Sequence, residues 1–211
     1  HNNLGNALQQ LGRFDDAIIS FNKVITIKPG LAEAHYSLGN TYKDSGQLDE
    51  AVTSYSKAIS IKPDYAEAYS NLGNALNRLE KPDRAIVSLN KSIAINPSFA
   101  EAHYNLGNTL KELQKLDEAM ESYRNAIIIK PDFSEAYSNL GNIFNELGRL
   151  DEAVSCHNKA LAIKPDFAMG HYNLGLDLKE LKHLDEALAS YDKAISIEPN
   201  YAEAYWNKSL I

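Results

Sequence analysis

A 34-residue period runs through almost the whole chain. Six prolines keep this spacing, at Pro29, Pro63, Pro97, Pro131, Pro165 and Pro199. Six glycines repeat at the same interval, at Gly5, Gly39, Gly73, Gly107, Gly141 and Gly175. A period longer than a helical turn and shorter than a domain indicates one supersecondary unit copied in tandem. Such units stack on their neighbours, so we expect a binding surface along the stack rather than inside one unit.

Each period contains two segments with helical hydrophobic spacing. In residues 32–65, apolar residues recur at three- and four-residue intervals on both sides of the interrupting segment SGQL at 45–48. The second segment ends at Lys62, because the residue before a proline is pushed out of the helical conformation. Each repeat is therefore predicted to form a pair of helices joined by a short turn.

Polar residues near the segment ends predict helix caps. We expect Asp49 to cap the second helix of its repeat, and Asp64 with Glu67 to form a capping box at the next first helix. The same capping boxes are predicted at Ser98/Glu101, Asp132/Glu135 and Asn200/Glu203.

The residues that recur resemble the tetratricopeptide repeat (TPR) family. Each period carries LGN or a variant of it, a turn, LDEA or a variant of it, and a closing proline. The recurring leucines are Leu4, Leu38, Leu72, Leu106, Leu140 and Leu174, and the recurring alanines are Ala17, Ala51, Ala85, Ala119, Ala153 and Ala187. The usual tryptophan of the family is replaced by His35, Tyr69, His103, Tyr137, His171 and Tyr205. The resemblance implies an all-α, right-handed α-solenoid, a superhelix of antiparallel helix pairs.

The period divides the chain into a single array over residues 1–211. We predict a partial repeat at 1–31, full repeats at 32–65, 66–99, 100–133, 134–167 and 168–201, and a terminal half-repeat at 202–211. The chain starts and stops inside a repeat, which indicates an array that was cut or that continues.

Composition narrows the classes of partner. With 21 basic and 28 acidic residues, the net charge of −7 repels polyphosphate, and no cluster of Lys or Arg offsets it, so we expect no nucleic-acid partner. No apolar run reaches the 18 residues of a membrane span, so we expect no membrane partner. The single Cys156 excludes an internal disulfide, which fits a cytoplasmic location.

No catalytic motif, metal site or cofactor site is predicted, and we expect a protein that is not an enzyme. The glycine-loop, HExxH and GxSxG patterns are missing, and Cys156 and His157 are neighbours that point in different directions on a helix. His35, His103 and His171 lie on separate helices in positions that face the core, which favours packing over metal ligation.

The first helix of each unit has two predicted faces. In residues 32–43, the core face contains His35, Leu38, Gly39 and Tyr42. The opposite face contains Glu33, Tyr36, Ser37, Asn40 and Lys43. The TPR resemblance implies that the first helices line a concave groove, so this second face is the candidate binding surface.

Asparagines form two ladders on this second face. The peptide-binding residues that we predict are Asn3, Asn6, Asn40, Asn71, Asn74, Asn105, Asn108, Asn139, Asn142 and Asn173, with Tyr36, Tyr104, Tyr172, Lys43, Lys111 and Lys179. An amide side chain both donates and accepts hydrogen bonds, so a ladder of amides suits the backbone of an extended polypeptide. The pattern resembles the asparagine ladders of O-linked N-acetylglucosamine transferase-like proteins, which hold extended polypeptides. Two alternatives stay open: the asparagines bond neighbouring helices or water, and the tyrosines pack between adjacent first helices.

A 68-residue alternation overlies the 34-residue period. Lys43, Lys111 and Lys179 occupy one set of repeats, whereas Asn77 and Asn145 occupy the other. Duplication of a repeat pair explains the alternation, and a partner that contacts every second repeat is the alternative.

The predicted function is a non-catalytic protein–protein interaction module for extended segments of other proteins. The segment AYWNKSL at 204–210 resembles bacterial proteins whose TPR array precedes a glycosyltransferase-like domain, so the substrate-docking arm of such an enzyme is one alternative. A scaffold that self-associates end to end is another. At the sixth glycine the ladder breaks, because Leu176 replaces asparagine, and we expect Leu176, Tyr172 and Trp206 to form an apolar step.

Overall fold

The computed structural model describes residues 2–211, and all regular secondary structure within this range is helical. The helices are α1 (Asn2–Gln10), α2 (Phe14–Ile27), α3 (Ala32–Asp44), α4 (Leu48–Ile61), α5 (Ala66–Arg78), α6 (Pro82–Ile95), α7 (Ala100–Glu112), α8 (Leu116–Ile129), α9 (Ser134–Glu146), α10 (Leu150–Ile163), α11 (Ala168–Glu180), α12 (Leu184–Ile197) and α13 (Ala202–Ser209). His1, with which the first partial repeat is predicted to begin, lies outside the described residues. The expected all-α fold of helix pairs is confirmed.

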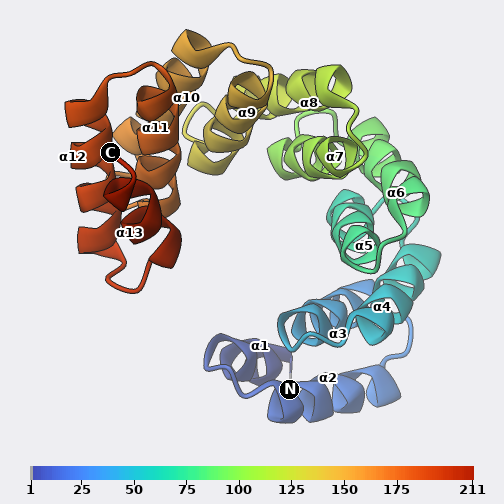
Figure 1. Cartoon of the computed structure of the whole chain (residues 1–211). Helices are drawn as coiled ribbons and strands as arrows, with labels where there is room; N and C mark the ends of the chain where they lie inside the picture. Colours follow the sequence, from blue (N-terminus) through green and yellow to red (C-terminus); the bar gives the residue numbers. More distant parts are fainter. Residues whose placement is uncertain (1) are drawn as a thin grey trace. The chain divides into compact units, whose positions relative to one another are not determined.

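The chain forms two compact units that meet in sequence between Lys115 and Leu116. The first unit holds α1–α7, and within it α1 packs on α2, α3 on α4 and α5 on α6 (Figure 1). The second unit holds α8–α13, with α9 packed on α10 and α11 on α12. Each second helix also packs on the next first helix inside its unit, as α4 does on α5 and α10 on α11. This nearest-neighbour packing is what a tandem repeat requires.

The turn inside each helix pair uses a left-handed backbone residue. Positive φ angles occur at Gly12, Gly46, Glu80, Gln114, Gly148 and Lys182, which are spaced 34 residues apart. Three of these positions hold glycine, which adopts this conformation without steric cost, and three hold residues with a side chain. The turn geometry is therefore kept even where the sequence does not favour it.

The two helices of one repeat meet at the recurring glycine. A Cβ atom at Gly39 would lie 2.7 Å from Cδ1 and Cε1 of Tyr55. At Gly73, a Cβ would lie 2.5 Å from Cγ of Leu89. Because real Cβ atoms do not approach other atoms so closely, only glycine lets the large side chain of the second helix lie against the first helix.

The predicted capping boxes are wrong. The N-cap residues of α5, α7, α9 and α13 are Tyr65, Phe99, Phe133 and Tyr201, and none makes a side-chain cap hydrogen bond. Asp64, Ser98, Asp132 and Asn200 precede these N-caps in the connecting segments. Asp49 also does not cap its helix, because it follows the N-cap residue Gln47 and lies in the first turn of α4.

Burial of an aromatic side chain explains the shifted helix start. Tyr65 and Phe133 are 9% and 8% exposed. Burying such a side chain contributes about 1.5–3 kcal/mol, whereas a polar cap contributes about 1 kcal/mol. The backbone therefore turns so that the aromatic residue faces the interior.

The glycine contact gives a first prediction. We expect Gly39→Ala to lower the free energy of unfolding by about 1–3 kcal/mol, because the new methyl group overfills the contact with Tyr55. Gly30→Ala is the matched control, since a Cβ there meets no atom of the described residues within 4 Å. Urea denaturation measures both, and equal stability of the two variants would contradict the account.

The turn geometry gives a second prediction. Lys182 has a φ of 66°, a conformation that costs a residue with a side chain about 1–2 kcal/mol. Glycine avoids this cost but loses about 0.5–1 kcal/mol of extra chain entropy, so Lys182→Gly should stabilise the protein by about 0.5–1 kcal/mol. The reverse change at the equivalent turn, Gly148→Ala, should destabilise it. Thermal melting of both variants checks the signs, and a loss of stability in Lys182→Gly would refute the explanation.

Candidate functional site

All the residues predicted to bind peptide lie on first helices. They are Asn3 and Asn6 on α1; Tyr36, Asn40 and Lys43 on α3; Asn71 and Asn74 on α5; Tyr104, Asn105, Asn108 and Lys111 on α7; Asn139 and Asn142 on α9; and Tyr172, Asn173 and Lys179 on α11. Asn3 and Asn6 are exposed and the others are half-buried. First helices contact each other across repeats, α3 with α5 and α5 with α7 in the first unit and α9 with α11 in the second. The candidate surface is thus continuous over neighbouring repeats within each unit.

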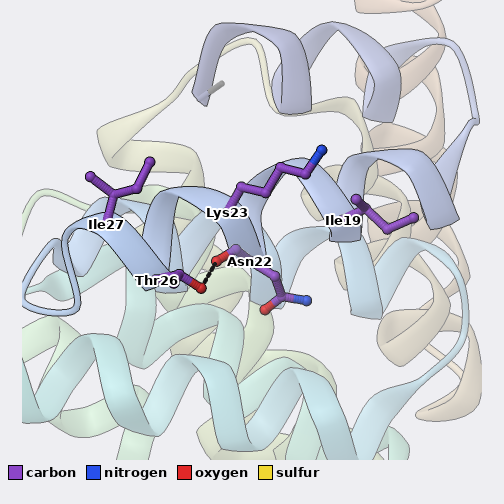
Figure 2. Close-up of a pocket in the computed structure, with 5 residues that line it drawn as sticks. All are labelled: Ile19, Asn22, Lys23, Thr26 and Ile27. Atoms are coloured by element: carbon purple, nitrogen blue, oxygen red, sulfur yellow. Dashed lines mark hydrogen bonds between the residues drawn. The ribbon is translucent and has the colours of Figure 1, made fainter.

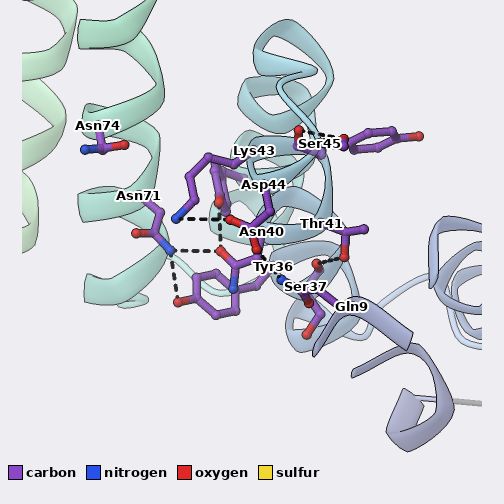
Figure 3. Close-up of polar contacts among 12 residues, drawn as sticks. Gln9, Tyr36, Ser37, Asn40, Thr41, Lys43, Asp44, Ser45, Asn71 and Asn74 are labelled. Carbon is purple, nitrogen blue, oxygen red and sulfur yellow. Dashed lines mark hydrogen bonds and ion pairs between the residues drawn. The ribbon is translucent and has the colours of Figure 1, made fainter. Parts of the chain in front are cut away.

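Asparagines of α3 and α5 bond directly to each other. Asn71 Nδ2 donates to Asn40 Oδ1 at 2.9 Å and to Tyr36 Oη at 3.1 Å, as Figure 3 shows. From the second helix below, Tyr55 Oη donates to the same oxygen of Asn40 at 2.7 Å. We call such a pair of asparagines on neighbouring first helices a rung. At the rung of Asn40 and Asn71, the alternative in which asparagines bond neighbouring helices is therefore realised, and the side chains remain half-buried.

The rung between α5 and α7 has weaker bonds. Asn74 Nδ2 donates to Asn105 Oδ1 at 3.5 Å, the limit of a hydrogen bond, and Asn105 Nδ2 donates to Ser70 Oγ at 3.1 Å. Leu89 occupies the position that Tyr55 has one repeat earlier, so no hydroxyl reaches Asn74 from below.

The rung between α9 and α11 repeats the first arrangement with a different partner. Asn173 Nδ2 donates to Asn142 Oδ1 at 2.9 Å. His157 Nε2 lies 3.2 Å from the same oxygen and 3.2 Å from the backbone oxygen of Ser138. A histidine here takes the place of the tyrosine hydroxyl.

The predicted tyrosines pack between helices as well as lining the surface. Tyr36 lies with its ring centroid 4.9 Å from that of Tyr65 and 6.0 Å from that of Tyr55. Tyr172 repeats these contacts with Tyr201 and Tyr191, at 5.0 and 6.0 Å. The predicted separation of a core face from an opposite face is therefore wrong at Tyr36, because its ring is wide enough to reach the core from the groove face. Burial raises the pKa of Tyr36, so its hydroxyl stays protonated.

A buried polar pair in the second unit was missed by sequence reasoning. His157 Nδ1 lies 2.5 Å from Asp177 Oδ2, and the side chains are 0% and 1% exposed. Asn145 Nδ2 donates to Asp177 Oδ1 at 2.9 Å. The sequence does contain a signal, because two residues differ from their equivalents in the other repeats. Asp177 stands where other repeats have small or apolar residues, and His157 stands where they have tyrosine, leucine or phenylalanine.

The ladder break leaves one hydroxyl without a partner. Tyr191 Oη is buried and has no hydrogen-bond partner among the described residues. Leu176, at the asparagine position, offers no acceptor and packs with Tyr172 against the cluster that contains Tyr191. Trp206, the third residue of the predicted apolar step, is 66% exposed. Burial raises the pKa of Tyr191 to about 12, which keeps its proton in place as a donor.

The other histidines and the cysteine have structural surroundings. The Nε2 atoms of His35, His103 and His171 lie 2.9–3.1 Å from the carbonyl oxygens of Pro29, Pro97 and Pro165. Burial raises the pKa of the Cys156 thiol to about 11, so it is not a reactive thiolate. Among residues 2–211, no group of three or more His, Cys, Asp and Glu side chains is arranged to hold a metal ion. Every described helix is too short or too polar to cross a bilayer.

Hollows also occur away from the ladders. Figure 2 shows a shallow one on the exposed side of α2, lined by Ile19, Asn22, Lys23, Thr26 and Ile27. Two others lie between the paired helices α3 and α4, and α5 and α6, and their lining residues are 34 positions apart. The hollow on α2 is lined by one helix, and the other two hold no array of convergent amides, so the ladders remain the candidate site.

Models of known repeat families match the chain at the positions of its repeats. The sequence matches the TPR repeat family at residues 5–46, 39–80, 73–114, 107–145 and 141–182, and the tetratricopeptide repeat at 168–201. A comparison with curated proteins gives no match.

Several solved structures resemble the chain. One is MamA, with 35% identity over 78% of this chain and 96% of that one and a TM-score of 0.68. Another is YrrB, described as a TPR protein with an unusual peptide-binding site, with 26% identity over 90% of this chain and 97% of that one and a TM-score of 0.67. PilW, a type IV pilus biogenesis factor, shares the fold with a TM-score of 0.87 at 21% identity, over 97% of this chain and 95% of that one.

The buried pair gives a third prediction. Asp177→Ala should lower the free energy of unfolding by about 3–5 kcal/mol, because it leaves the buried His157 without its partner. The double variant His157→Tyr with Asp177→Ala should recover most of this loss, since Tyr55 and Ala75 fill the equivalent positions in an earlier repeat. Urea denaturation of both variants checks this, and a double variant as unstable as Asp177→Ala would rule the explanation out.

Proposed function

The chain belongs to the tetratricopeptide repeat family, and we propose that it is a non-catalytic protein–protein interaction module that binds extended polypeptide segments along its asparagine ladders. The matched repeats extend from residue 5 to residue 201. The likeness to YrrB, described with a peptide-binding site, supports a peptide as the ligand. A cytoplasmic location is part of the proposal, since the single Cys156 gives the chain no disulfide of its own.

The observation that supports this proposal is that some amide N–H groups and oxygens of the ladder asparagines remain available to bond a ligand. At the rung of Asn40 and Asn71, no described residue bonds to Asn71 Oδ1, and Asn40 Nδ2 bonds to Tyr36 through only one of its two N–H groups. Both side chains are half-buried, so these atoms are partly shielded from water. A peptide unit supplies one acceptor and one donor, which is the complement of this pair.

Spacing fits an extended ligand. Neighbouring helices in contact lie roughly 8–10 Å apart, and an extended peptide advances about 3.3 Å per residue. Each repeat would therefore contact about three ligand residues. Because the asparagines address the backbone, we expect modest sequence specificity, set by the tyrosines and by Lys43, Lys111 and Lys179 beside the ladders.

This function gives the fourth prediction, tested with a peptide selected from a random 12-residue library. Replacing Asn74 and Asn105 with alanine removes two backbone-binding groups, each contributing about 0.5–1.5 kcal/mol. The two groups together contribute about 1–3 kcal/mol, so we expect Kd to rise at least about fivefold, since 1.4 kcal/mol corresponds to a factor of ten. Isothermal titration calorimetry measures the change.

The control uses two asparagines away from the ladders. Asn22 and Asn90 are exposed residues of the second helices α2 and α6. Replacing both with alanine should leave Kd unchanged. If the ladder and control variants bind the selected peptide equally well, the asparagine groove is not its binding site.

A further inference from the structure

Each second helix has one buried residue at the same position of the 34-residue period. These floor residues are Phe21, Tyr55, Leu89, Tyr123, His157 and Tyr191, spaced 34 residues apart, and each is 0% exposed. Four of them lie against the glycine that immediately precedes a ladder asparagine: Phe21 against Gly5, Tyr55 against Gly39, Leu89 against Gly73 and His157 against Gly141. A polar group at the tip of a floor residue is therefore placed to meet the ladder side chain.

At Tyr55 the floor residue fixes the orientation of an amide. Asn40 Oδ1 accepts from Tyr55 Oη and from Asn71 Nδ2, so both of its lone pairs are used. Burial raises the pKa of Tyr55, so the phenol keeps its proton and acts as the donor. Asn40 Nδ2 bonds to Tyr36 through one N–H group, and its second N–H group is left for a ligand. Asn71 spends both N–H groups on Asn40 and Tyr36, which leaves its Oδ1.

His157 produces the same orientation by another route. The backbone oxygen of Ser138, 3.2 Å from His157 Nε2, can only accept, so this nitrogen carries a proton. The same nitrogen faces Asn142 Oδ1 at 3.2 Å, and Asn173 Nδ2 donates to that oxygen at 2.9 Å. Asp177 holds the opposite ring nitrogen and so fixes the ring. Asn142, like Asn40, keeps only its Nδ2 group for a ligand.

Leu89 provides no donor, and the amide above it is turned the other way. Asn74 points its Nδ2 toward Asn105 Oδ1, and no described residue bonds to Asn74 Oδ1. The converse case is Tyr191, whose hydroxyl has no acceptor because Leu176 replaces the asparagine. The bond therefore needs both a donor on the floor residue and an Oδ1 atom on the ladder asparagine. Where one of these two groups is missing, the other does not form this bond.

We infer that the floor residues set the hydrogen-bond polarity of the ladder, so that Asn40 and Asn142 bind peptide carbonyl oxygens whereas Asn74 binds a peptide N–H. The inference rests on the proposed function and adds the ligand chemistry of individual rungs. Tyr55 and His157 are positioning residues in this arrangement, because they act on the ligand through an asparagine. A carboxylate could also accept from Asn40, so the test separates the two acceptors.

The test uses the full chain and the side-chain amide resonances of asparagine in ¹⁵N-resolved NMR spectra. N,N-Dimethylacetamide is the probe, because it carries a peptide-like carbonyl and no N–H. It should shift the Nδ2 resonances of Asn40 and Asn142 at least about twofold more than that of Asn74. Acetate at equal concentration should shift them less than the amide probe does. Equal responses at the three asparagines, or a larger response to acetate, would overturn the inference.

Two matched variants connect the response to the floor residue. Tyr55→Phe removes the hydroxyl that Asn40 accepts, so the Asn40 response should fall to that of Asn74 while the Asn142 response is kept. Tyr191→Phe removes a hydroxyl with no partner and should change neither response. An unchanged Asn40 response in Tyr55→Phe, with a native circular dichroism spectrum, would refute the role of the floor residue.

The inference and the proposed function fail in different ways. If the selected peptide ignores the ladder asparagines but the probe responses follow the floor residues, the proposed peptide site is wrong and the polarity of the amides stands. If the peptide requires the asparagines but the probe responses do not follow the floor residues, the site stands and the inference is wrong.

Discussion

Within a repeat, a large side chain of the second helix packs directly against the recurring glycine of the first helix. It joins the two helices of a repeat, because no Cβ keeps the Tyr55 ring away from Gly39. The same approach carries the Tyr55 hydroxyl to Asn40, the residue that follows this glycine on the first helix. A bulkier residue would push the ring back and break that hydrogen bond. Packing inside a repeat and the chemistry of its groove side therefore have one common cause.

The fifth glycine position shows how far this arrangement tolerates change. His157 keeps the bond to the ladder asparagine, but the histidine needs a partner for its second ring nitrogen, and Asp177 of the next repeat supplies it. Burying a pair of ionisable groups carries a desolvation cost that tyrosine and alanine avoid. The pair also connects α10 to α11, and Asn145 of α9 joins through Asp177. Neighbouring repeats are here joined by hydrogen bonds as well as by apolar packing.

Much of the fold was predictable because the period repeats each local signal several times. The helix pairs, the turns and the glycine contact follow from spacing alone. The capping boxes were not predictable, since an aromatic residue next to each of their polar candidates takes the N-cap position, and only tertiary burial decides between the two. The ladders could be placed on one helix face by periodicity. Their bonds to Tyr55 and His157 could not, because helical periodicity describes one helix and not how the next one meets it.

If the asparagine-bearing faces of the first helices hold an extended polypeptide, protons of that polypeptide lie beside the ladder amides. Isotope-filtered NMR, with labelled protein and an unlabelled selected peptide, tests this placement most directly. We expect nuclear Overhauser contacts from peptide protons to the side-chain amides of Asn40, Asn71 and Asn74. Contacts confined to the second helices, at residues such as Thr53 and Val87 in the hollows between paired helices, would contradict it.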